Sequence, residues 1–228
     1  MATVTSKPIR KFVGCLLVGI LISQAIHAQS LFQQVVEIKQ SDRFEETKQE
    51  IIETLLSSET WELTEELILA CGYLQLKETM DVLRNVSNDR TAPRNLRVAA
   101  YKALARMGDE NALHFLISQV ERIGMNDDVV AILLPDLIYT QQRAAFDLII
   151  AALYDDTPRC ISSNPNNEVP IPCGYRIMEM LAPLIKNFPL DVEASGDIKA
   201  RDYREALQIL RRWFQNHKAD YVILTDKF

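Results

Sequence analysis

The chain has 228 residues, of which 48% are hydrophobic and 25% charged, with only 7 glycines and 9 prolines. This composition excludes an intrinsically disordered or collagen-like chain and is sufficient for one folded domain with a sizeable core. Acidic residues outnumber Lys and Arg by 31 to 25, and no basic cluster stands out, so nucleic acid is not an expected partner.

The first 28 residues have the pattern of a secretory signal peptide. Lys7, Arg10 and Lys11 precede an apolar run over 12–22, and the small-residue sequence AIHA ends at Ala28, which is the usual order of the charged, apolar and cleavage regions. A membrane anchor is the alternative, but the apolar run has 11 residues, whereas a span takes about 20. We therefore predict cleavage after Ala28.

Export changes the expected properties of the chain. The mature domain, residues 29–228, has 22 Lys and Arg against 31 Asp and Glu, and hence a net charge of −9. We expect this domain to be periplasmic or fully secreted and to have no membrane span.

The mature domain is predicted to begin with a helical hairpin. Residues 30–57 place Phe44, Ile51 and Leu55 on one helical face. The register of this hairpin is shifted relative to the segments that follow, as is common for the terminal unit of a repeat array.

Residues 94–123 predict a second kind of hairpin, with a sharper break. Apolar residues recur every three or four positions on both sides of the sequence MGDE, as on one face of a helix. Gly108 can take the left-handed conformation that ends the first helix, and Asp109 can cap the second helix through its side-chain oxygen.

This hairpin recurs at a step of 33 residues. Residues 70–83, 103–116 and 136–149 align with apolar residues at corresponding positions and with the same order of helix, short break and helix. Internal repetition at this period predicts a helical solenoid.

The sequence RVAAYKALARMGDENALHFL resembles the HEAT-like repeat, particularly the short bilin-lyase-type form, whose consensus combines an alanine-rich helix, a Gly-Asp turn and a second helix with apolar pairs. The likeness is good over 94–123, fair over 60–90 and weaker over 127–155, where Asp136 replaces an alanine. Ankyrin repeats share the step, but their loop glycines are absent. The resemblance implies an all-α solenoid of about five stacked helical hairpins.

Cys160 and Cys173 flank a polar, proline-rich segment and are predicted to form a disulfide that closes a loop insertion over 156–174. Such a bond stabilises the fold by about 3 kcal/mol in the chain-entropy model. Two free thiols are the alternative, and metal ligation is disfavoured because no histidine or further cysteine lies at ligand spacing. Cys71, in an apolar helical stretch, is expected to pack as a small apolar residue.

Beyond the insertion the chain departs from the period. A helix is predicted over 174–188 and a last helix over 200–217, whose apolar stripe consists of Tyr203, Leu207, Leu210 and Trp213. The final sequence DYVILT either packs over the end of the stack or remains mobile, and the sequence leaves both open.

No motif for catalysis or cofactor binding is found. The mature domain has two histidines, His114 and His217, and no Gly-rich phosphate loop, CxxC or HExxH. Acidic pairs such as Asp127 and Asp128 are interpreted as solvated or helix N-terminal charges. We therefore expect neither an enzyme nor a bound cofactor or metal.

One polar column is the candidate site. The 33-residue step aligns Asp81, His114 and Asp147 on the second helices, and the resemblance implies that these helices line a concave surface. A ridge that binds a partner is the functional interpretation, and ordinary solvated positions are the alternative. The neighbouring polar residues that would contribute are Lys77, Arg84, Asn85, Glu110, Ser118 and Arg143.

A second candidate is the loop from Arg159 to Cys173, because insertions on repeat arrays often belong to the binding face. A tolerated surface insertion is its alternative.

The function that we expect is that of an exported, non-enzymatic scaffold that binds a protein or peptide through its concave face. The alternative is an enzyme or an enzyme's accessory subunit, as among bilin lyases and some DNA glycosylases. A bilin lyase needs a tetrapyrrole, and a DNA glycosylase needs a basic surface.

Overall fold

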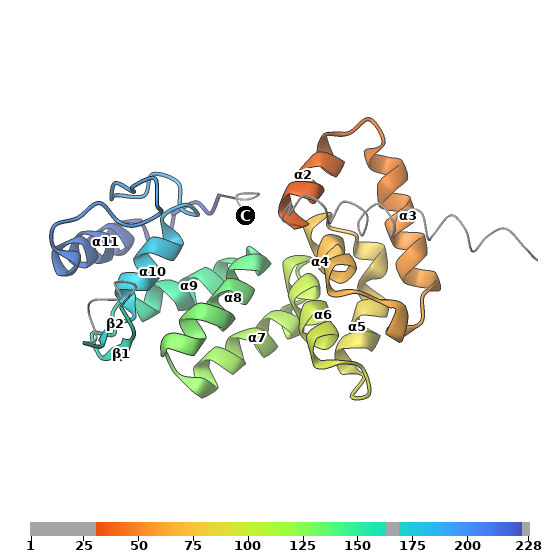
Figure 1. The fold of residues 1–228 in the computed structure, drawn as a ribbon, viewed down its shortest axis with the longest axis horizontal. Coiled ribbons are helices and arrows are strands. Elements are labelled where there is room, and N and C mark those ends of the chain that lie inside the picture. Colours follow the sequence, from red (N-terminus) through yellow and green to blue (C-terminus); the bar gives the residue numbers. More distant parts are fainter. Residues whose placement is uncertain (1–30, 163–168, 225–228) are drawn as a thin grey trace, which may run out of the picture. The chain divides into compact units, whose positions relative to one another are not determined.

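A computed structural model describes residues 31–162 and 169–224, so the predicted signal peptide lies outside the described residues. Over the described ranges the protein is mostly helical, with one short two-stranded sheet (Figure 1). The all-α class is therefore confirmed. By its internal contacts the chain divides into two compact units, Met1–Ala103 and Leu104–Phe228, and each is described by itself. No described helix combines the length and the hydropathy that crossing a bilayer requires.

The N-terminal unit contains the predicted first hairpin and the helices that follow. Ile51 and Leu55 are buried, as predicted, while Phe44 is half-buried. Helix α2 packs against α3 and α4. The elements are α2 (Leu31–Gln40), α3 (Phe44–Ser57), η2 (Thr60–Glu62), α4 (Glu65–Tyr73), η3 (Lys77–Thr79), α5 (Met80–Asn88) and most of α6 (Arg94–Arg106).

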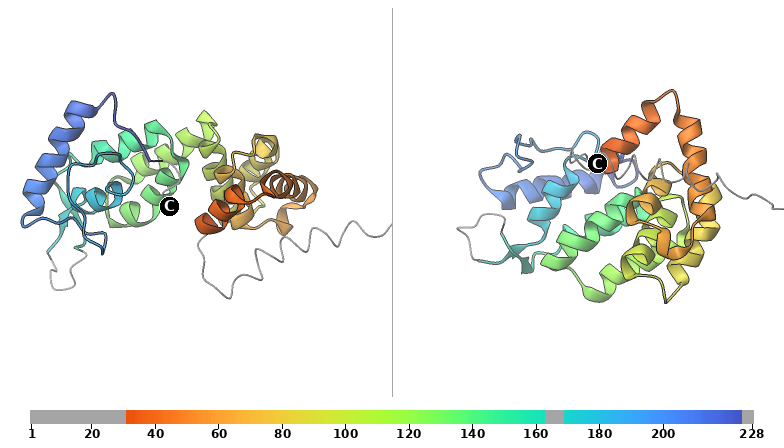
Figure 2. Two further views of the ribbon diagram at one scale, coloured as in Figure 1. Left: turned by 90° about the horizontal axis from the view of Figure 1, so that it is seen from above. Right: turned by 45° about the vertical axis from the view of Figure 1, so that its right-hand side comes forward.

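In the C-terminal unit, α8 packs against α7 and α9, and α10 packs against α9 and α11 (Figure 2). A π-helical turn, η4, leads directly into α8. The elements are α7 (Glu110–Ile123), η4 (Val129–Leu133), α8 (Leu134–Thr140), α9 (Arg143–Ala152), β1 (Pro158–Cys160), β2 (Ile171–Pro172), α10 (Gly174–Leu181) and α11 (Tyr203–His217).

The predicted 33-residue step is present in the backbone of the turns. Gln75, Gly108 and Gln141 have positive φ angles of 57°, 94° and 56°. Each of these residues donates its amide N–H to the carbonyl three positions earlier, at 3.2, 3.0 and 3.1 Å respectively. The left-handed residue thus ends the first helix of every hairpin at the same position.

The second helices begin in the same register. Lys77, Glu110 and Arg143 are the first residues of η3, α7 and α9. The Asp109 side chain accepts a hydrogen bond from the Ala112 amide at 3.0 Å, which confirms the predicted cap. The hairpins therefore share both the turn and the helix start.

Burial follows this register as well. Several corresponding positions of the three hairpins are at most 6% exposed, even where the residue types differ, while the aligned column of Val82, Phe115 and Leu148 is half-buried. The buried columns include Cys71, Leu104 and Leu137; Leu74, Met107 and Thr140; and Leu83, Leu116 and Ile149. The periodic apolar pattern is therefore the core pattern of these helices.

Two predictions about the C-terminal unit need correction. The helix predicted over 174–188 ends at Leu181, two residues before Pro183, which cannot continue a helix because it has no N–H and its ring clashes with the preceding turn. In α11, Phe214 is buried and Trp213 only half-buried, so the stripe turns by one position. Leu207 and Leu210 are buried as predicted.

Candidate functional site

The predicted column residues of the first two hairpins lie on exposed helix surfaces. Asp81 and Arg84, on α5 in the N-terminal unit, are both exposed and form an ion pair of 2.8 Å. His114, on α7 in the C-terminal unit, is exposed, and Ser118 is half-buried, with its hydroxyl donating to the Phe115 carbonyl of the same helix at 2.7 Å. These contacts are local and leave the outer helix faces accessible.

The third hairpin is different, because Arg143 and Asp147 on α9 bind another part of the chain. The Arg143 guanidinium donates to the carbonyl oxygens of Lys218 and Tyr221 at 2.5 and 2.9 Å. Its carbon lies 3.4 Å from the centroid of the Tyr221 ring. The Tyr221 hydroxyl donates to Asp147 Oδ1 at 2.7 Å. The two predicted partner-binding residues therefore hold the segment after α11.

We call residues Lys218–Leu224 the tail segment. The Lys186 amide donates to the Val222 carbonyl at 2.9 Å, and the Leu224 amide donates to the Leu184 carbonyl at 2.7 Å. These bonds form an antiparallel bridge between Ile185 and Ile223. Of the two possibilities that the sequence left open, the tail segment packs against its own unit.

Tyr221 is the buried anchor of the tail segment. Its side chain is 5% exposed, and the ring meets Phe214 of α11 edge-on at 5.7 Å between centroids. Burial, together with the hydrogen bond to Asp147, raises the pKa of Tyr221 above its ordinary value. The phenol therefore stays protonated and remains a donor over the neutral range. Sequence reasoning missed this residue, and its only signal was an apolar run after a helix.

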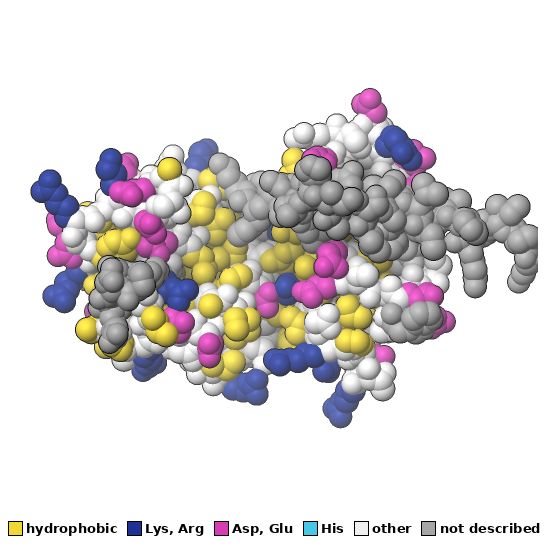
Figure 3. All heavy atoms as spheres, in the orientation of Figure 1, with side chains coloured by type: hydrophobic (Ala, Val, Ile, Leu, Met, Phe, Trp, Pro, Cys, Tyr) yellow, Lys and Arg dark blue, Asp and Glu magenta, His cyan; other side chains and the backbone are white. Residues whose placement is uncertain are grey.

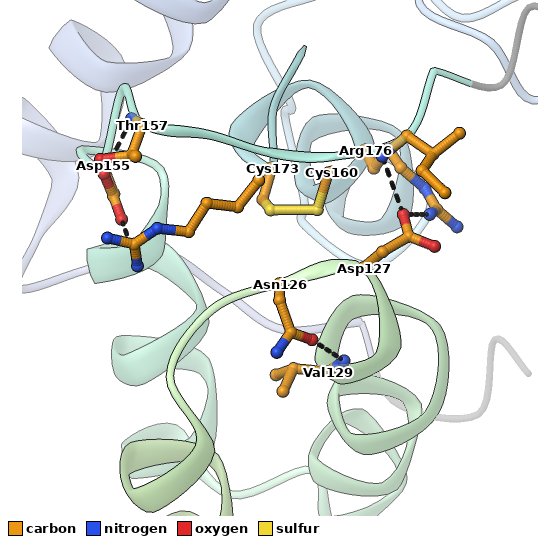
Figure 4. Close-up of a disulfide and its surroundings, with 10 residues drawn as sticks. Asn126, Asp127, Val129, Asp155, Thr157, Cys160, Cys173 and Arg176 are labelled. Atoms are coloured by element: carbon orange, nitrogen blue, oxygen red, sulfur yellow. Dashed lines mark hydrogen bonds and ion pairs between the residues drawn. A yellow bond between two sulfur atoms is a disulfide. The ribbon is translucent and has the colours of Figure 1, made fainter. Parts of the chain in front are cut away.

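The predicted disulfide between Cys160 and Cys173 is present (Figure 4), with 5.0 Å between the Cα atoms. The segment, expected to be an irregular loop, begins and ends as a short antiparallel pair of β1 and β2. Both sulfur-bearing residues are at most 3% exposed, so the bond is shielded from reductants. Two branched apolar side chains at the described ends of the loop, Ile161 and Val169, are 67% and 68% exposed.

Asp127 joins this hairpin to the helical segment that contains η4. It lies at the N-terminal end of that segment, as one of the two interpretations predicted, and the other interpretation, a solvated charge, is wrong because the carboxylate is paired. Its Oδ1 accepts hydrogen bonds from the Ile161 amide at 3.0 Å and from the Arg176 guanidinium at 2.5 Å (Figure 4). A carboxylate with two such donors is held as an acceptor. The expectation failed because both donors follow Asp127 in sequence by more than thirty residues.

Other predicted features are structural. Cys71 is fully buried, and burial raises the pKa of its thiol to about 12, so it packs as an apolar residue and is not a nucleophile at neutral pH. Among the described residues no group of three His, Cys, Asp or Glu side chains could hold a metal ion. On the face shown in Figure 3, basic and acidic side chains are interspersed.

Glu179 and Tyr203 form a further polar pair, in which the Tyr203 hydroxyl donates to Glu179 Oε1 at 2.7 Å. Burial raises the pKa of both groups. The pair joins α10 to α11, and each group has the other as its hydrogen-bond partner. We therefore interpret it as a structural link between the two helices and not as a catalytic proton donor.

Comparison with known proteins gives no family model, no curated protein and no solved structure that matches the chain. The functional argument therefore depends on the residues and the geometry described above.

Proposed function

We propose that the protein is an exported, non-enzymatic scaffold of the HEAT-like solenoid type, which binds a protein or peptide partner through the exposed face of its second helices. The observation that carries this proposal is the recurrence of left-handed residues at Gln75, Gly108 and Gln141. A turn that recurs at a fixed step is typical of an array of equivalent helical units.

The exposure of the second helices supports the binding role. Asp81, His114 and Asp147 occupy corresponding positions of α5, α7 and α9, and all three are exposed. In helical-repeat proteins such positions belong to extended surfaces that bind other polypeptides. The apolar residues on either side of Asp81 and His114 are half-buried, so the surface around these two positions combines exposed polar and partly accessible apolar groups, as protein interfaces do.

The disulfide supports the exported location. Disulfides persist in oxidising compartments and are rare in the cytosol, and the bond between Cys160 and Cys173 is buried and intact. The N-terminal segment 1–28, with its charged, apolar and small-residue regions, is the proposed export signal.

The test is a capture experiment with residues 29–228 as bait against an envelope extract of the native host. The bait is compared with an Asp81→Ala/His114→Ala variant, because both residues are exposed and neither belongs to the tail segment's contacts. The matched control is Glu66→Ala/Arg94→Ala, which changes exposed residues of the first helices α4 and α6.

We expect one partner that the wild-type and control baits retain and that the second-helix variant loses by at least about tenfold, roughly 1.4 kcal/mol. All three baits must have the same circular dichroism spectrum. Equal capture by the variant and the wild type, or no specific capture by any bait, would overturn the proposed second-helix surface.

A further inference from the structure

The surface of α9 already holds the tail segment, in which a turn over residues 218–220, bonded back to the His217 carbonyl, leads into a stretch that pairs with another backbone over residues 221–224. Arg143 donates to two of its main-chain carbonyls, and the backbone of Leu184 and Lys186 pairs with Val222 and Leu224. These bonds depend on the backbone of the bound segment rather than on its side chains. The bonds to Val222 and Leu224 are therefore available to any extended chain that lies in this position, whereas the two bonds from Arg143 also require the turn that precedes Tyr221.

One contact with the tail segment depends on a side chain, that of Tyr221. The Tyr221 hydroxyl donates to Asp147, and the ring lies beneath the Arg143 guanidinium and against Phe214. A phenylalanine at this position would keep the ring contacts but remove the hydroxyl, leaving Asp147 Oδ1 only the longer bond from Arg143 Nε at 3.4 Å, which weakens binding because a charged acceptor loses its shorter hydrogen bond. The site thus selects tyrosine.

Backbone pairing combined with an aromatic anchor is one general mode in which a peptide binds along another backbone, and the isolated bridge between Ile185 and Ile223 is a short example of such pairing. We call Arg143, Asp147 and the backbone of Leu184–Lys186 the tail site. Even with the tail segment in place, the Arg143 and Asp147 side chains are 40% and 52% exposed, so the tail site borders solvent. An incoming segment has access to it.

The same combination of charges recurs in the first hairpin. Lys77 and Asp81 occupy the positions that correspond to Arg143 and Asp147, and both are exposed. A cation followed four residues later by a carboxylate therefore occurs in two hairpins, although Asp81 pairs with Arg84 and not with Lys77.

We propose that the tail site is a peptide-binding site, that its partner is a polypeptide with an extended segment containing tyrosine, and that the tail segment competes with this partner by occupying the site within the chain. The inference rests on the proposed scaffold function and deepens it, because it names the chemistry of the partner. Attachment to the same chain gives the tail segment a high effective concentration, so the partner binds weakly until the tail segment is released.

The experiment uses residues 29–228 and a fluorescent peptide of sequence KADYVIL, which reproduces residues 218–224. Fluorescence anisotropy measures its binding to the wild type and to Tyr221→Ser, which removes the anchor of the internal segment. We expect the variant to bind the peptide at least about tenfold more tightly than the wild type, because its tail segment no longer competes.

Two comparisons test the chemistry. A peptide with phenylalanine in place of tyrosine should bind Tyr221→Ser about tenfold more weakly, and adding Asp147→Asn to that variant should cause a similar loss. Adding Asp128→Asn, an exposed carboxylate outside the tail site, is the matched control and should leave binding unchanged.

A second variant tests whether release of the tail segment, and not misfolding of Tyr221→Ser, causes the change in peptide binding. Leu224→Pro removes the amide that donates to the Leu184 carbonyl and keeps Tyr221 in place, and it should also increase peptide binding. If both variants unfold, the tail segment is part of the core and the inference is overturned.

Two further outcomes also overturn it. One is no increase in peptide binding by folded variants. The other is concentration-dependent dimerisation of the released variants that excludes the peptide, which would identify the occupant as a second copy of the chain. None of these outcomes bears on the Asp81 and His114 capture experiment, so the proposed function is judged separately.

Discussion

The three repeated hairpins, residues 65–152, and the segment after them, residues 153–224, are stabilised by different means. In the hairpins, most backbone groups are satisfied inside helices, and periodic apolar side chains form the core. After Leu153 the helices α10 and α11 are joined by long irregular segments. These segments are held by a disulfide and by hydrogen bonds from arginine and tyrosine side chains.

Arg211 illustrates the second kind of stabilisation. It is 7% exposed, and its Nε donates to the Leu153 carbonyl at 2.6 Å while its guanidinium pairs with Asp156 at 2.5 Å. The Tyr154 hydroxyl in turn donates to the Arg211 carbonyl at 2.9 Å. One arginine thereby satisfies the carbonyl at the end of α9, which has no helical partner.

The difference has a physical origin. Irregular backbone cannot satisfy its own N–H and C=O groups, and a buried group left without a partner destabilises the fold. Long side chains such as Arg143 and Arg211 donate hydrogen bonds to carbonyl groups of the irregular backbone, which in a sheet would be satisfied by a neighbouring strand. The C-terminal segment should therefore be more sensitive to single polar substitutions than the hairpins, although these also contain one such link, from buried Arg106 to the Tyr139 carbonyl. The hairpins should respond to changes of turn conformation.

The largest expected effect comes from the disulfide. Replacing Cys160 and Cys173 together by serine should lower the free energy of unfolding by about 3 kcal/mol, because the unfolded chain loses its closed loop. Urea denaturation followed by circular dichroism measures this change. A reductant should leave the double variant unaffected, and a loss below about 1 kcal/mol would show that the Asp127 contacts alone hold the hairpin.

The next largest effect is expected at Arg211. Arg211→Met keeps much of the volume but leaves the Leu153 carbonyl without its donor, which should cost about 2 kcal/mol. Arg212→Met is the matched control because Arg212 is exposed, and its effect should stay within about 0.5 kcal/mol. Equal effects of the two variants in the same urea titration would contradict the role assigned to Arg211.

Tyr221→Phe should have a smaller effect that depends on pH. Loss of the hydrogen bond to Asp147 should destabilise the fold by about 1 kcal/mol at pH 7. Burial raises the pKa of Tyr221 above the ordinary value of 10, so the unfolded chain loses this proton first. The stability that the phenol contributes is therefore fully present below pH 10 and is lost as pH rises through the folded pKa.

The measurement is urea denaturation of the wild type and Tyr221→Phe between pH 7 and pH 11. The stability difference between them should be constant up to about pH 10 and then decrease. The shifted pKa of Tyr203 affects both proteins alike and cancels in the difference. A pH-independent difference would mean that the phenol of Tyr221 is not buried against Asp147.

The same contrast explains what could be predicted from sequence. The break at Gly108, the cap at Asp109 and the step of 33 residues were predictable because each is encoded within a few neighbouring residues. Pairing of Cys160 with Cys173 was predictable because both cysteines flank one loop in a chain whose first 28 residues have the sequence pattern of an export signal.

The polar contacts of the candidate site could not be predicted. Tyr221 and Asp147 are separated by 74 residues, and Arg211 and Leu153 by 58 residues. No local pattern encodes such pairs, because the sequence around Asp147 is that of an exposed helix surface whether solvent or the tail segment covers it. Gln141 was also missed as a left-handed residue, because glutamine rarely takes that conformation.

The smallest effects are expected at the turns of the hairpins, and they have opposite signs. Gly108→Ala should destabilise the fold by about 1 kcal/mol, because its φ of 94° strains a residue with a Cβ atom. No heavy atom lies within 4 Å of the added Cβ, so the cost is conformational and not steric. Gln141→Gly relieves the same strain at the corresponding position and should stabilise the fold by about 0.5 kcal/mol after the added chain entropy is counted.

Thermal and urea denaturation of both variants measure this pair of changes against the wild type. If the two turns are equivalent, the effects must differ in sign, and combining the substitutions should give their sum if the two sites are independent. Destabilisation by Gln141→Gly would show instead that the Gln141 side chain, whose amide donates to the Ile138 carbonyl at 3.3 Å, contributes more than the left-handed backbone costs. The third turn would then be held by its own side chain, in the manner of the C-terminal segment that follows it.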